Sequence, residues 1–143
     1  MEKHQIRVIV LWVVCLIGMI LHFNYHVSKI FYGINVVRPG ATGEISAMAH
    51  VMKSVYYHLP MIFIVAQLYF TAAWFRLTMF GISIIYSFSH VLHVVDEVTK
   101  PVLDWSQIPL LSLVLIFSLL LNWSSWMYYR AAVPAKRTTA QLA

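Results

Sequence analysis

Histidine is concentrated in three apolar segments of this 143-residue chain, with spacings that suit metal or haem binding. His22 and His26 are four residues apart, and His90, His93 and Glu97 follow one another at intervals of three and four. Such intervals put side chains on one face of a helix. Histidine is costly inside a bilayer and usually has a partner or a function there. These residues are therefore the first candidates for a functional site.

The candidate histidines also fall at similar heights if the segments cross a membrane in alternating directions. We take Ile6, Phe75 and Leu77 as starting points and a rise of about 1.5 Å per residue. Four imidazoles then lie roughly 20–26 Å from the starting end. These four are His22, His58, His90 and His93. Three helices are therefore predicted to place imidazoles in one layer.

A transition metal is the first cofactor that such a layer would bind. Neutral imidazole is the commonest metal ligand, and two histidines on one helical face can donate two nitrogens to one ion. Several imidazoles with a carboxylate suit zinc, copper or iron. Glu97 would either ligate the ion or hold a histidine N–H. The predicted metal ligands are His22, His26, His58, His90, His93 and Glu97.

A b-type haem is the alternative cofactor, because histidines from different helices at one height can bind its iron from both sides. His22 with His90, or His58 with His93, would form the axial pair. From the sequence, both cofactors remain candidates.

Composition indicates that membrane helices hold these residues. The chain is 61% hydrophobic and 10% charged, with a mean hydropathy of +0.76. A soluble domain has about 25% charged residues. Four apolar segments reach the roughly 20 residues that a bilayer crossing needs. They span about residues 6–37, 44–75, 77–98 and 107–130.

These segments predict an all-α integral membrane protein. Short connections favour a single antiparallel bundle of four transmembrane helices over residues 1–130, followed by a disordered cytoplasmic tail over residues 131–143. Pro60 predicts a kink in the second helix. Cys15, the only cysteine, allows no intrachain disulfide and is expected to be a small core residue.

The placement of charge predicts the orientation of the bundle. One set of segment ends carries six basic residues and one acidic residue, for a net charge of +5, whereas the other carries four of each. Positive ends face the cytoplasm, so both termini and a turn at Arg76 are predicted there, in a multi-pass protein of a bacterial inner membrane. The expected partner is the lipid bilayer, and no nucleic acid is expected.

Three functions fit these patterns. The first is a metal or haem site in the outer half of the bundle, with redox or hydrophobic-substrate chemistry. The second is a non-catalytic subunit of a larger membrane complex or a homo-oligomer, since the chain is small and almost wholly apolar. The third is a cofactor-free lipid-modifying or isomerising enzyme in which histidine and carboxylate act as acid and base.

Overall fold

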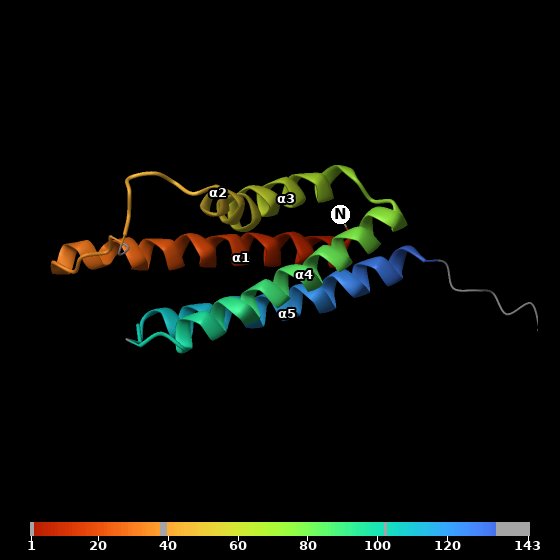
Figure 1. The fold of residues 1–143 in the computed structure, drawn as a ribbon. Helices are drawn as coiled ribbons and strands as arrows, with labels where there is room; N and C mark the ends of the chain where they lie inside the picture. Colours follow the sequence, from red (N-terminus) through yellow and green to blue (C-terminus); the bar gives the residue numbers. More distant parts are fainter. Residues whose placement is uncertain (1, 38–39, 102, 134–143) are drawn as a thin grey trace, which may run out of the picture.

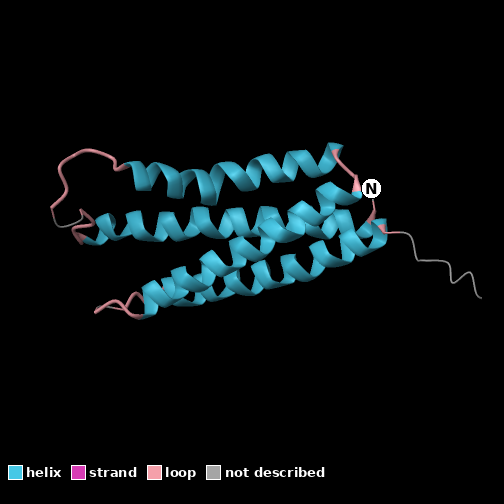
Figure 2. Cartoon of the chain, turned by 45° about the vertical axis from the view of Figure 1, so that its right-hand side comes forward, coloured by secondary structure: helices cyan, strands magenta, loops and turns pink. Residues whose placement is uncertain are grey.

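The computed structural model describes residues 2–37, 40–101 and 103–133. All regular structure in these ranges is helical, which confirms the all-α part of the predicted fold class. Figures 1 and 2 show α1 (Lys3–Ser28) with the 3-10 turn η1 (Lys29–Tyr32), α2 (Ala47–Lys53), the π-helical turn η2 (Ser54–His58), α3 (Leu59–Tyr69), α4 (Ala73–Val98) and α5 (Gln107–Ala132). The segments α2, η2 and α3 continue one another as a single rod.

Four rods are long and apolar enough to cross a membrane: residues 3–32, 47–69, 73–98 and 107–132. They alternate in direction along the chain (Figure 1). Their outer surfaces carry large apolar side chains, and Ile85 and Phe88 of α4 are 72% and 63% exposed. Exposed apolar surface on this scale is unusual for a soluble monomer and fits an apolar solvent.

The helix α5 packs along both α1 and α4, while α3 packs against α1. Figure 1 shows α3 on the side of α1 that is away from α5. Among the described residues, the backbones of α3 and α4 have no extended contact. On this side the contact is made by side chains, such as the ring of Tyr56 in η2 against His90 and His93 of α4.

Close packing of α1 on α5 depends on Gly18. A Cβ atom at this position would collide with Cγ2 of Val114. Small residues allow such approach between apolar helices. The adjoining core contains Cys15, as predicted, and its buried members are Val8, Trp12, Cys15, Tyr86, Leu121 and Tyr128.

Arg76 of α4 forms hydrogen bonds with three other parts of the chain, at the end of the bundle where α4 begins. Its guanidinium donates to both carboxylate oxygens of Glu2, over 2.8 and 2.9 Å. It also donates to the backbone carbonyls of Thr71 at 2.8 Å and Tyr128 at 3.1 Å. The guanidinium carbon lies 4.0 Å from the centroid of the Tyr128 ring, a cation–π distance.

Helix boundaries differ from the sequence prediction at several places. The first helical rod ends at Tyr32, short of residue 37, because Gly33 adopts a φ of +71° and its N–H bonds to the Ile30 carbonyl. The turn before α4 covers residues 70–72, so that Arg76 lies inside the helix. Residues 131 and 132, predicted to be disordered, are helical, and residues 134–143 of the predicted tail lie outside the described ranges.

Pro60 produces a local widening of the helix. Proline lacks an N–H, and its ring crowds the carbonyl four residues earlier, which here belongs to Tyr56. The backbone accommodates this with the π-helical turn η2, in which the Leu59 N–H bonds to the Ser54 carbonyl. Tyr56 lies in this turn and directs its ring toward α4, where it contacts His90 and His93.

Candidate histidine site

His22 of α1 and His93 of α4 meet at the centre of the candidate site. Their Nε2 atoms are 2.9 Å apart, and the two rings are nearly perpendicular at a centroid distance of 4.7 Å. His22 is buried and His93 is half-buried. The predicted convergence of imidazoles from separate helices is therefore present for this pair.

Gln107, the first residue of α5, fixes the orientation of the His22 ring. Its Nε2 donates to the backbone carbonyl of His22 at 3.2 Å, which leaves its Oε1 facing Nδ1 of His22 at 2.6 Å. Since an amide oxygen only accepts, Nδ1 carries the proton. A neutral His22 then presents a lone pair on Nε2 toward His93, which donates from its own Nε2.

Sequence reasoning missed Gln107. The available signal was a glutamine that opens an apolar segment next to the predicted outer turn, at the level of the histidine layer. Its side chain is fully buried.

His90 lies one turn below His93 on α4 and is almost completely buried. Its ring packs edge-on against Tyr86 at a centroid distance of 4.5 Å and lies 5.6 Å from Tyr56. Neither ring nitrogen of His90 has a hydrogen-bond partner among the described residues. His90 is therefore in the predicted layer, but it is not bonded to the His22–His93 pair.

The two remaining predicted histidine ligands are at the edge of the site or outside it. His26 is exposed, with its ring centroid 5.5 Å from that of His22. His58 is also exposed, and its Nδ1 lies 3.3 Å from the Ser54 hydroxyl. In the described part of the chain, none of the aromatic contacts or hydrogen bonds joins His58 to another histidine. The structure thus does not bring His58 to the site.

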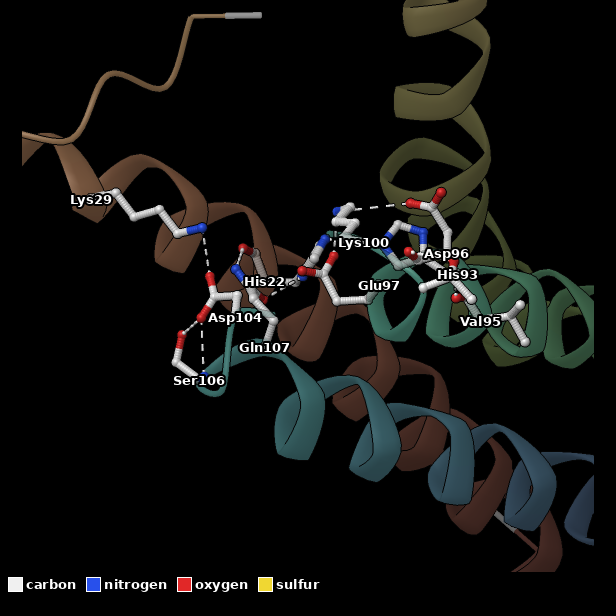
Figure 3. Close-up of polar contacts among 11 residues, drawn as sticks. His22, Lys29, His93, Val95, Asp96, Glu97, Lys100, Asp104, Ser106 and Gln107 are labelled. Carbon is white, nitrogen blue, oxygen red and sulfur yellow. Dashed lines mark hydrogen bonds and ion pairs between the residues drawn. The ribbon is translucent and has the colours of Figure 1, made fainter. Parts of the chain in front are cut away.

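Glu97 places a buried negative charge beside the site. Its carboxylate is buried and lies 2.5 Å from the Lys100 ammonium (Figure 3). Asp96, which is largely exposed, lies 3.8 Å from the same ammonium. Glu97 and Lys100 are among the charged groups nearest to both His22 and His93. The predicted role of Glu97 as a direct ligand would require it to leave Lys100.

A second ion pair lies at the same end of the bundle. Asp104, in the α4–α5 loop, lies 2.6 Å from the Lys29 ammonium (Figure 3). Partial burial acts to raise the Asp104 pKa. Hydrogen bonds from Lys29 and Ser106 outweigh that effect and lower the pKa from 3.8 to about 2. The loop is thereby fixed to η1, next to Gln107.

The His22–His93 pair fits a metal ion better than it fits haem. In tetrahedral coordination, two imidazole nitrogens that each lie about 2.0–2.1 Å from one ion are roughly 3.3 Å apart, so the observed 2.9 Å would lengthen slightly when an ion binds. A histidine ligand commonly donates its other N–H to an oxygen, as His22 does to Gln107. The described residues contain no group of three or more His, Cys, Asp or Glu positioned to hold an ion. An ion bound by His22 and His93 would therefore need further ligands from water or from a side chain that changes its position.

Haem would need a different arrangement of these residues. A gap of 2.9 Å between the paired nitrogens leaves no space for a porphyrin plane. The predicted axial pair of His58 and His93 is not formed, since His58 is turned outward. His22 and His90 share no hydrogen bond or ring contact among the described residues.

No protein-family model, curated protein or solved structure matches the chain. The function is therefore inferred from the geometry of the site.

Proposed function

We propose that this chain is a small integral membrane protein that binds one transition metal ion between His22 and His93, near the outer end of the bundle. Zinc, copper and iron are the candidate metals. His22 and His93 would supply two nitrogens, and His26 would be the nearest further ligand. The ion would supply Lewis-acid or redox chemistry beside the bilayer, where a hydrophobic substrate is available.

The opposed ring nitrogens of His22 and His93 are the observation that carries the proposal. The two residues come from different helices, 71 positions apart, and their Nε2 atoms face each other at 2.9 Å. Gln107 holds the His22 ring with its Nε2 lone pair directed at that contact. Such pre-orientation is the arrangement that a bound ion requires of a ligand. The buried Glu97 would balance part of the cation's charge.

Metal analysis of the purified protein tests this proposal. The protein is stripped with a chelator, incubated separately with Zn²⁺, Cu²⁺ and Fe²⁺, desalted and measured by elemental mass spectrometry. We expect about one ion per chain for at least one metal, and loss of that ion in His22→Gln and His93→Gln. His58→Gln is the matched control and should retain it. Equal metal content in the wild type and both site variants would refute the proposal.

A second candidate function follows from the completeness of the hydrogen bonds around His22. Both of its ring nitrogens have protein partners without any ion. This favours the alternative of a non-catalytic membrane subunit in which the pair only joins α1 to α4. Metal-free protein that keeps its thermal stability, together with a larger complex seen by native mass measurement, would support that alternative.

The proposal includes the orientation of the chain. Basic residues gather at the ends of the rods near Arg76, so both termini would be cytoplasmic and the histidine site would lie toward the outer face. Single cysteines in a Cys15→Ser background test this in a bacterial host. A cysteine replacing Leu103 should react with a membrane-impermeant reagent in intact cells, whereas one replacing Ala132 should not. The opposite labelling would reverse the orientation.

A further inference from the structure

Three adjacent side chains below the histidine pair have hydrogen-bonding atoms that find no partner among the described residues. They are Nε1 of Trp12, the hydroxyl of Tyr86 and both ring nitrogens of His90. All three residues are buried, with exposed fractions of 0%, 5% and 1%. The Trp12 and Tyr86 rings are 5.0 Å apart, and the Tyr86 and His90 rings 4.5 Å apart. Folded proteins leave few buried polar groups unpaired, so three in contact indicate a site for a ligand.

The unpaired groups are mainly donors. Indole N–H can only donate, the tyrosine hydroxyl has a proton to donate, and a neutral histidine donates from one nitrogen. A complementary ligand would therefore carry acceptors such as carbonyl oxygens. The site is also lined by aromatic rings, which favour a flat ligand packed against them.

Tyr56 packs against two of these three residues, Tyr86 and His90, from the side of η2. It is only half-buried, and its ring lies 5.9 Å from Tyr86, 5.6 Å from His90 and 5.8 Å from His93. It belongs to η2, and π-helical turns of this kind frequently occur at functional sites. Since η2 packs on α1 and has no extended backbone contact with α4 among the described residues, an outward swing of the Tyr56 side chain would not separate packed helices.

We propose that a lipid-soluble quinone enters between η2 and α4 and binds where the Tyr56 ring now lies. A quinone ring has nearly the size of the tyrosine ring that it would replace. Its carbonyl oxygens would accept hydrogen bonds from Tyr86 and His90, and its apolar tail would extend into the bilayer. The inference depends on the proposed membrane insertion, and it does not require a metal at His22 and His93.

A binding titration tests the site. Chelator-treated protein in lipid nanodiscs is titrated with a decyl-substituted benzoquinone, and quenching of tryptophan fluorescence reports binding. We expect saturable binding that weakens about tenfold in Tyr86→Phe and in His90→Phe, because each loses one donor to the ligand. Tyr69→Phe is the matched control, since Tyr69 is exposed on α3 away from the site, and its binding should equal that of the wild type.

A decylbenzene of equal apolar size separates specific binding from partition into the lipid. It lacks carbonyl oxygens and does not itself quench tryptophan, so it is added in excess as a competitor and should leave the saturable quenching by the quinone unchanged. Quinone affinity unchanged in both site variants, or displacement of the quinone by decylbenzene, would overturn the proposal. Quinone binding by metal-free protein that takes up no metal would refute the metal proposal alone. Metal uptake without quinone binding would refute the quinone site alone.

Discussion

Gln107 of α5 forms two hydrogen bonds with His22 of α1. Its oxygen accepts from the imidazole Nδ1 at 2.6 Å, and its nitrogen donates to the backbone carbonyl of the same histidine at 3.2 Å. The second bond fixes which way the amide is turned, and the first then fixes the tautomer of the ring. A residue of the fourth rod therefore determines which nitrogen of His22 is presented to His93.

Replacing Gln107 should weaken metal binding without removing a ligand. In Gln107→Leu the His22 ring loses its acceptor, and loss of such a partner typically costs 10–100-fold in metal affinity, a range we expect here. Competition with a chromogenic chelator measures the affinity. Gln5→Leu is the control, because Gln5 is a buried glutamine that donates to the Gln67 carbonyl at the opposite end of the bundle. A comparable loss in both variants would show a general effect on folding.

Gly18 should tolerate no added methyl group. In Gly18→Ala the new Cβ meets Val114 Cγ2, and overpacking of this kind costs about 1–3 kcal/mol. We expect thermal unfolding in detergent, followed by circular dichroism, at a lower temperature than for the wild type. Gly81→Ala is the control, since no heavy atom lies within 4 Å of the added Cβ and alanine favours the helix. Equal or higher stability of Gly18→Ala would contradict the packing of α1 on α5.

The sequence could predict one property of the site, which is the height of each histidine along its helix. Segment ends and alternating directions were enough to bring His22, His90 and His93 to one level. They were not enough for His58, because height does not specify which face of a helix turns inward. The π-helical turn and the packing of the Tyr56 ring on α4 decide that rotation, and they turn His58 outward.

Two features depended on tertiary contacts that no local pattern reports. Gln107 became part of the site because the α4–α5 loop carries it to His22. Arg76 was predicted in a turn on the basis of charge, yet it is buried within the first turns of α4 because Glu2, Thr71 and Tyr128 satisfy its guanidinium. In both cases partners distant in sequence decide the placement of a polar side chain.

Arg76→Lys should destabilise the bundle more than Glu2→Gln does. A lysine ammonium cannot reproduce the forked contacts of the guanidinium to Glu2, Thr71 and Tyr128. Glu2 is largely exposed, so its own contribution should stay below about 1 kcal/mol. Thermal unfolding in detergent compares the two, with the exposed Arg7→Lys as the control. Arg76→Lys with wild-type stability would rule out this role of the guanidinium.

The Lys29–Asp104 ion pair should make stability depend on pH only in the acid range. Asp104 has a pKa of about 2 in the folded state against an ordinary value of 3.8. A lowered carboxyl pKa stabilises the folded state above the ordinary value, and that stabilisation is lost as pH falls toward the folded-state value. Asp104→Asn removes the ion pair at every pH, while its side-chain oxygen can still accept from Ser106. The stability difference between wild type and variant should therefore be constant near neutral pH and shrink between about pH 4 and pH 2.

Thermal unfolding at a series of pH values from 6 to 2 measures this difference. It should reach about 1 kcal/mol at pH 6, the scale of a partly exposed ion pair. Asp96→Asn serves as the control, because that carboxylate is 74% exposed and lies 3.8 Å from its lysine; it should change little across the range. A wild-type advantage over Asp104→Asn that persists undiminished at pH 2 would mean that the carboxylate acts through its shape or its bonds to Ser106, and not through its charge.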